Sequence, residues 1–114
     1  MEQSLPIKKR KRRSDRTHIV YQLTNETTGQ IYIGITVVTG KAFKRSLTER
    51  WKRHVSRTKH ESHEWPICKS IREYGEQAFT REILHTIRGK KQAHSLETLL
   101  IRHLQPQLNT ISII

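Results

Sequence analysis

The sequence has little that would cross-link or stiffen the chain. Cys68 is its single cysteine, and its 114 residues include three prolines and only 6% aromatic residues. One cysteine excludes an internal disulfide and fits a reducing compartment. No apolar run approaches the length of a membrane helix, and no apolar segment follows the basic start. We therefore expect neither a membrane span nor a secretory signal.

Acidic residues are also scarce, with 10 Asp and Glu against 22 Lys and Arg, so the net charge is +12. The excess lies in two segments. Residues 1–16 contain seven basic and two acidic residues, and residues 41–59 contain eight basic and one acidic residue. In the rest of the chain, basic and acidic residues are equal in number. Basic residues clustered in this way indicate a polyanionic partner, most often nucleic acid.

The first 16 residues show no hydrophobic periodicity and contain an unbroken cationic run. We predict a disordered basic arm over residues 1–16, followed by one domain over residues 17–114 with a modest core. The run would bind phosphates, or act as a nuclear localisation signal in a eukaryote. We expect the protein in the cytoplasm of a bacterial or phage-infected cell, or in the nucleus of a eukaryotic one. The run consists of Lys8, Lys9, Arg10, Lys11, Arg12 and Arg13.

The hydrophobic pattern predicts the order ββααβα. Two strands should form a hairpin, and a loop rich in glycine and lysine should follow. The string Ser46-Leu47-Thr48-Glu49 matches a capping box, which predicts that a helix begins there. The expected ranges are 17–24 and 30–36 for the hairpin strands, 37–46 for the loop, 64–74 for the second helix, 78–87 for the third strand and 91–104 for the last helix. This order predicts an α+β fold, a small three-stranded antiparallel sheet flanked by helices.

The helix after the hairpin places two polar side chains beside its apolar stripe. Arg50 and His54 are four residues apart and so share one face. Leu47, Trp51 and Val55, together with Thr58, form the stripe. Taken alone, the helix is better interpreted as an ordinary basic surface helix than as part of a site.

Glu97 is unusual because helical geometry places it on the inward stripe of the last helix, with Ala93, Leu100, Ile101 and Leu104. A lone buried carboxylate is costly unless it is paired or binds a metal. A structural salt bridge and a metal ligand are therefore the two interpretations of Glu97.

These features together resemble the GIY-YIG nucleases. The hairpin strings Ile19-Val20-Tyr21 and Tyr32-Ile33-Gly34 resemble the motif that names the family, although Ile19 stands where the name requires glycine. In the family an arginine, a histidine, a glutamate and an asparagine follow in order. Together with the two hairpin tyrosines, the corresponding residues in this chain are Tyr21, Tyr32, Arg50, His54, Glu97 and Asn109. The resemblance covers residues 17–110, and the string 50–54 is similar to the helix of phage homing endonucleases of this family.

The resemblance implies an endonuclease that hydrolyses double-stranded DNA with one divalent cation, Mg²⁺ or Mn²⁺, bound by Glu97 and no small-molecule cofactor. Arg50 would stabilise the transition state, and a tyrosine would activate water. We favour Tyr21 as the base, with His54 as its relay and Tyr32 in support. Nearby positive charge would have to lower the tyrosine pKa. Asn109 completes the catalytic set. Cutting both strands would require a homodimer or sequential nicking.

The hairpin register decides how the tyrosines lie. If Tyr21 pairs with Ile33, Tyr32 points to the opposite face of the sheet. If the register is shifted by one residue, both tyrosines lie on one face. The sequence leaves both registers open.

We expect DNA contacts from the arm, from the 37–46 loop and from the basic helix. The loop is longer than the family's usual link and could also be a mobile solubilising segment. The rival function is a non-catalytic DNA- or RNA-binding module, which explains the charge equally well but not the co-occurring catalytic set. The expected contacts outside the arm are Lys41, Lys44, Arg45, Lys52, Arg53, Arg57 and His63.

Overall fold

The computed structural model describes residues 16–61 and 65–109. The cationic run 8–13 and His63 lie outside the described residues, so the expectations for them remain predictions. The elements follow the expected order ββααβα. They are β1 (Thr17–Asn25), β2 (Ile31–Val37), α1 (Phe43–His60), α2 (Pro66–Tyr74), the short 3₁₀ helix η2 (Glu76–Ala78), β3 (Phe79–Arg88) and α3 (Lys90–Leu104).

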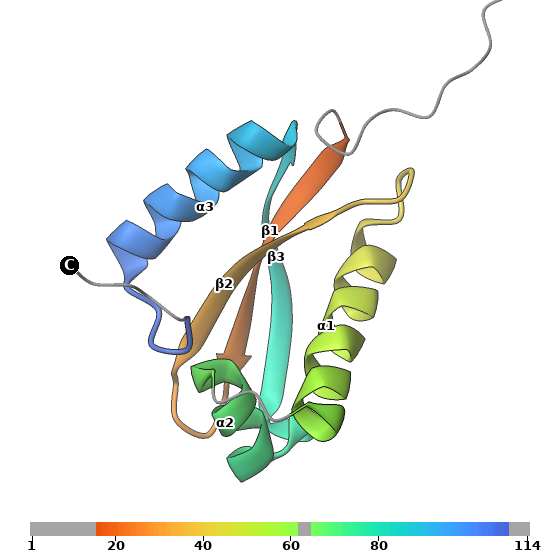
Figure 1. The fold of residues 1–114 in the computed structure, drawn as a ribbon. Helices are drawn as coiled ribbons and strands as arrows, with labels where there is room; N and C mark the ends of the chain where they lie inside the picture. The colour runs from red at the N-terminus through yellow and green to blue at the C-terminus, as the bar shows by residue number, and fades with distance from the viewer. Residues whose placement is uncertain (1–15, 62–64, 110–114) are drawn as a thin grey trace, which may run out of the picture.

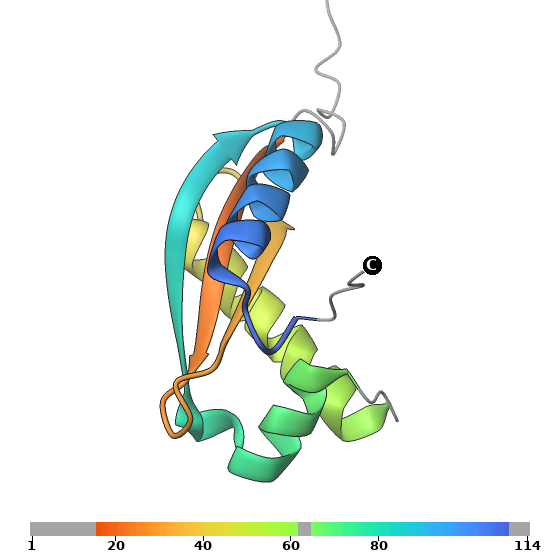
Figure 2. The ribbon, with the colours of Figure 1, turned by 90° about the vertical axis from the view of Figure 1, so that its left-hand side faces the viewer.

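The three strands of the described chain form one antiparallel sheet in the order β2-β1-β3. The α1 and α2 helices pack on one face of this sheet, and α3 packs on the other (Figures 1 and 2). β2 is an edge strand, and α1 and α3 lie on either side of it (Figure 1). The predicted α+β fold is thus confirmed, and none of the described helices is long and apolar enough to cross a membrane.

The main core lies between the sheet and the two helices α1 and α2. Alternate residues of β1 point into it, and Ile19, Tyr21 and Leu23 are completely buried there. The predicted apolar stripe of α1 is confirmed, because Trp51 and Val55 are buried in the same cluster. Ile19 therefore packs in the core at a position where the family name has glycine.

The hairpin adopts the shifted register. Tyr21 pairs with Gly34, and Leu23 pairs with Tyr32. Directly paired residues of antiparallel strands point to the same face, so the two tyrosines lie together on the α1 side. Their ring centroids are 6.2 Å apart.

The start of α1 differs from the prediction. The helix begins at Phe43, and its N-cap residue, Ala42, makes no side-chain capping bond. Ser46 lies in the first turn, where its hydroxyl donates to the Ala42 carbonyl at 2.7 Å and accepts from the Thr39 N–H at 3.3 Å. The capping-box prediction was therefore wrong, because this serine bonds backward along the helix. The loop between β2 and α1 is accordingly shorter than the predicted 37–46 range.

The last helix is less buried than the pattern predicts. Ala93 is its one fully buried residue, and Leu104, expected on the inward stripe, is 42% exposed. The helix ends there, with Gln105 in the left-handed conformation (φ 47°) as the C-cap. The chain then turns back to β2, where the Leu108 N–H donates to the Ile31 carbonyl at 3.0 Å.

Candidate active site

An open cleft of about 790 Å³ lies along the β2 edge of the sheet. We call it the edge cleft. Its lining residues come mainly from β2, α1 and α3. The two helices lie on opposite faces of the sheet (Figure 1). Three of the predicted catalytic residues line it, and each comes from a different element: Tyr32 from β2, Arg50 from α1 and Glu97 from α3.

Beside the edge cleft, three predicted residues form a polar cluster in which Tyr21 and His54 are buried and Arg50 is partly exposed. A hydrogen bond of 3.0 Å joins the Tyr21 hydroxyl to His54 Nε2. Arg50 Nε donates to the same hydroxyl at 3.3 Å. The one-turn spacing of Arg50 and His54 is what brings both side chains to a single oxygen.

Tyr32 contacts both this polar cluster and the edge cleft. Its ring lies edge-on to His54, with centroids 5.1 Å apart, and the side chain also lines the cleft. Gly34 makes the close approach of the tyrosines possible. A Cβ at position 34 would lie 2.6 Å from the Tyr21 hydroxyl oxygen and 2.9 Å from a Tyr32 ring carbon. Such distances are far inside van der Waals contact, so any side chain here would push the rings apart.

Burial dominates the ionisation of the cluster. It lowers the pKa of His54 to about 3, helped by the positive charges of Arg50 and Arg57, so His54 is neutral at neutral pH. Burial also raises the pKa of Tyr21 and of Tyr32. Arg50 opposes this rise at both tyrosines, as expected from the sequence, but the burial effect is larger. The expected net lowering of the tyrosine pKa is therefore not found in the free protein.

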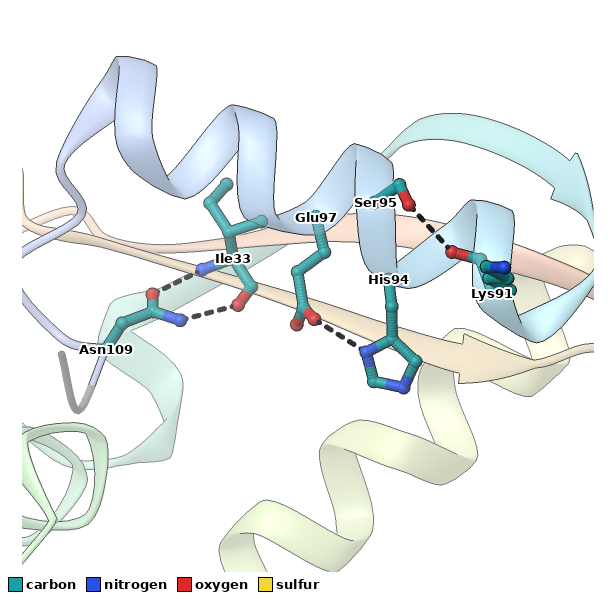
Figure 3. Close-up of polar contacts among 6 residues, drawn as sticks. All are labelled: Ile33, Lys91, His94, Ser95, Glu97 and Asn109. Atoms are coloured by element: carbon teal, nitrogen blue, oxygen red, sulfur yellow. Dashed lines mark hydrogen bonds and ion pairs between the residues drawn. The ribbon is translucent and has the colours of Figure 1, made fainter. Parts of the chain in front are cut away.

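Glu97 points from α3 toward β2, and His94, one helical turn earlier, points to the same place (Figure 3). His94 Nδ1 lies 3.4 Å from Glu97 Oε1, and the Glu97 side chain is 20% exposed. Burial raises the pKa of Glu97, while the nearby His94 and Arg50 act in the opposite direction. The sequence predicted an inward, buried carboxylate, and in the structure Glu97 is only partly buried, with His94, a residue that the sequence reasoning missed, as its ion-pair partner.

Asn109 is not one of the residues that line the edge cleft. Its side-chain amide pairs with the backbone of Ile33: Oδ1 accepts from the Ile33 N–H and Nδ2 donates to the Ile33 carbonyl, both at 2.8 Å (Figure 3). The amide thus bonds the open edge of β2 between Tyr32 and Gly34. This contact positions the strand, and a direct catalytic role for Asn109 stays a prediction.

Some of the predicted DNA contacts line the edge cleft in the structure, and others lie outside it. Arg45 and Arg53 line the edge cleft, whereas Lys41, Lys44 and Lys52 are exposed outside it and Arg57 is half-buried. Sequence reasoning missed Lys90, His94 and His18, which also line the cleft. The spacing of Lys90, His94 and Glu97 along one helix was the available signal, since residues three or four apart share a face.

The edge cleft has the ligand chemistry of a sparse divalent-cation site. In the described part of the chain, no three His, Cys, Asp or Glu side chains gather as a metal site. A hard cation such as Mg²⁺ commonly binds one or two carboxylates and fills its remaining positions with water and phosphate oxygens. A half-buried carboxylate facing an open cleft fits that description, so Glu97 is the residue that would hold the ion.

Comparisons with known proteins show the family and the fold of the chain. Residues 3–106 match the family model described as "Putative endonuclease segE, GIY-YIG domain". The chain therefore belongs to the GIY-YIG endonuclease family. The match includes most of the N-terminal segment that the sequence analysis separated as an arm.

Solved structures show the same fold. The catalytic domain of the homing endonuclease I-TevI matches with a TM-score of 0.63 at 22% identity, over 85% of this chain and 98% of that one. A glutamate-to-alanine mutant of the catalytic domain of intron endonuclease I-TevI matches with a TM-score of 0.63 at 24% identity, over 86% and 94%. None of the curated proteins matches the chain significantly.

Proposed function

We propose that this domain is a metal-dependent endonuclease that hydrolyses phosphodiester bonds of double-stranded DNA in the edge cleft. The observation that carries the proposal is the convergence of Tyr32, Arg50 and Glu97 on one cleft from three separate elements. A hydroxyl, a guanidinium and a carboxylate are together suited to water activation, phosphate binding and cation binding.

Arg50 is suited to bind the reacting phosphate. Its Nε–H is held by the Tyr21 hydroxyl, which fixes the plane of the guanidinium. Burial disfavours its charge, but the neighbouring tyrosine hydroxyls more than compensate and raise its pKa. The remaining N–H groups can bond two phosphate oxygens at once and stabilise the charge that develops in the transition state.

In this proposal Tyr32 first loses its own proton to solvent, and the resulting phenolate orients the attacking water and takes its proton. The side chain of Tyr21 is completely buried, whereas Tyr32 lines the edge cleft. Burial therefore favours Tyr32 over Tyr21, the base preferred from the sequence. Tyr21 and neutral His54 then hold the Tyr32 ring and Arg50 in place from behind. Arg50 favours the phenolate, because it lowers the pKa of Tyr32 against the effect of burial.

One divalent ion, Mg²⁺ or Mn²⁺, would be held by Glu97. When bound, the ion supplies positive charge to the phosphate and the leaving oxygen. The negative charge of Glu97 raises the pKa of Tyr32 in the free protein. Neutralising Glu97 would therefore also favour the phenolate. No small-molecule cofactor is needed for this hydrolysis.

The decisive experiment compares wild type with Glu97→Gln on supercoiled plasmid in Mg²⁺. The substitution keeps size and hydrogen bonding but removes the charge that binds the cation. We expect wild type to nick or linearise the plasmid, and Glu97→Gln to bind DNA with similar affinity but cut about a hundred- to a thousandfold more slowly, the scale seen when one charge-stabilising group is lost. His103→Gln, at an exposed residue in the last turn of α3, should cut like wild type.

The rival function predicts a different result. A non-catalytic binding module would retard DNA on a gel without cutting it in Mg²⁺ or Mn²⁺, and competition with RNA would then reveal which nucleic acid it prefers. Cleavage that persists unchanged in Glu97→Gln would contradict the role proposed for this carboxylate.

A further inference from the structure

We propose that His94 is a second protein ligand of the cation, so that the ion is bound by a His94–Glu97 pair on one face of α3. The two side chains are three residues apart and lie side by side in the edge cleft. Figure 3 shows both leaving the same side of the helix toward β2. The inference relies on the proposed function only in taking Glu97 as the carboxylate that binds the ion.

The distance between the two donor atoms suits a shared ion. Two ligands bound at about 2.1 Å, at angles between octahedral and tetrahedral, lie about 3.0–3.4 Å apart. His94 Nδ1 and Glu97 Oε1 are 3.4 Å apart. The same two residue types at a spacing of three, but in the opposite order along the chain, are used on helices that bind transition metals. The pair could therefore accept an ion with little movement of either side chain.

The surroundings leave room for the ion and its remaining ligands. His94 is 53% exposed, and the edge cleft opens directly beside it. In the described part of the chain, Glu97 Oε2 has no hydrogen-bond partner, so the carboxylate keeps free lone pairs. Lys90, one turn before His94, lines the same cleft and is placed to pair with a phosphate that shares the ion.

An imidazole ligand changes which ions the site prefers. Carboxylates and water favour Mg²⁺, whereas imidazole favours Co²⁺, Ni²⁺ and Zn²⁺. A site built on Glu97 alone would discriminate weakly among these ions. A His94–Glu97 pair should instead bind Co²⁺ much more tightly than Mg²⁺, and this preference should depend on His94.

The test measures ion binding by the full chain without DNA. Co²⁺ and Mg²⁺ are titrated by calorimetry, and Co²⁺ also by its visible absorption, into wild type, His94→Ala and His94→Asn. We expect both variants to lose at least about tenfold in Co²⁺ affinity, the lower end of what is lost when even an outer-shell partner of a metal ligand is removed. Mg²⁺ affinity should change less than threefold. The asparagine keeps an N–H near the Nδ1 position, so it should retain the contact with Glu97 but not the metal bond.

Two controls separate ligation from other effects. His103→Ala removes an exposed histidine of the same helix outside the edge cleft, and should leave Co²⁺ binding unchanged. Circular dichroism and urea unfolding establish that each variant is folded, as expected for an exposed residue.

Three results would overturn the inference. These are unchanged Co²⁺ affinity in His94→Ala, recovery of Co²⁺ affinity in His94→Asn, and an equal loss for both ions, which would make His94 a residue that only positions Glu97. Each can occur while wild type still cleaves DNA in Mg²⁺, so failure here is distinct from failure of the nuclease proposal. A protein that binds Co²⁺ through His94 but never cuts DNA would refute the proposed function instead.

Discussion

At the scale of single residues, the candidate site depends on how closely a few polar groups can be packed. The hydroxyl of Tyr21 contacts both His54 and Arg50, and Tyr32 lies against the same histidine. Gly34 is the residue that leaves space for this arrangement. In the free protein burial raises the pKa of both tyrosines and lowers the pKa of His54, so it favours the neutral form of all three groups.

Gly34→Ala should disrupt this packing. The added methyl group would lie 2.6 Å from the Tyr21 hydroxyl, so the tyrosine rings must move. We expect a loss of about 1–3 kcal/mol in the free energy of unfolding, typical of overpacking, and a larger proportional loss of cleavage. Urea unfolding and plasmid cleavage measure the two effects. Gly40→Ala is the control, since its methyl meets nothing within 4 Å although its φ of +59° adds backbone strain. Equal activity in the two variants would refute the packing argument.

His54 should make the protein less stable in acid. Its folded pKa is about 3, against an ordinary 6.5, so the unfolded chain binds a proton first as the pH falls. The effect is absent above about pH 7 and grows as the pH drops through 6.5 toward 3. Between pH 7 and 4.5 we expect wild type to lose about 2 kcal/mol more unfolding free energy than His54→Gln. Urea titrations at both pH values test this, and the same loss in both proteins would contradict it.

At the scale of elements, β2 is an edge strand whose free side is bonded by the chain segment after α3. Asn109 makes two hydrogen bonds to Ile33, and Leu108 makes a backbone bond to Ile31. An unpaired strand edge is a liability that proteins commonly cover. Here the covering segment also fixes the strand that carries Tyr32 and Gly34.

Asn109→Ala should loosen this edge. Losing both bonds to Ile33 is expected to cost about 1–3 kcal/mol of stability and to speed exchange of the Ile33 amide hydrogen. Native-state hydrogen exchange measures the effect directly. Gln107→Ala is a milder control, because its single bond to the Ile31 N–H is longer, at 3.4 Å, and exposed. Unchanged exchange at Ile33 would show that Asn109 does not hold the strand.

At the scale of the whole molecule, positive charge surrounds the edge cleft. Arg45 and Arg53 of α1 and Lys90 of α3 line it from opposite faces of the sheet. An elongated polyanion could therefore contact both helices while its backbone crosses β2. This arrangement is what we expect of a nuclease that binds DNA mainly through phosphates.

Arg53→Ala should weaken DNA binding in a salt-dependent way. Removal of one phosphate contact is expected to reduce the slope of log affinity against log salt concentration by about one. Fluorescence anisotropy at several salt concentrations gives this slope. Arg102→Ala, in the last turn of α3, is a control of equal charge at an exposed residue outside the edge cleft. Equal slopes for the two variants would refute a specific contact at Arg53.

The order of the elements and the types of residue at the site could be predicted from the sequence alone. Periodicity reports which face of an element is apolar, so the α1 stripe and the half-buried Glu97 were readable locally. Helix ends were harder to predict, because a serine hydroxyl can cap a helix or, as Ser46 does, bond back to the carbonyl four residues earlier. The tertiary structure decided the hairpin register, since a one-residue slip keeps the pattern but exchanges the faces. It also decided that Tyr32 rather than Tyr21 lines the edge cleft, and that His94 stands beside Glu97. Burial and proximity arise only when distant segments pack together, and they set the pKa values and contacts on which the chemistry depends.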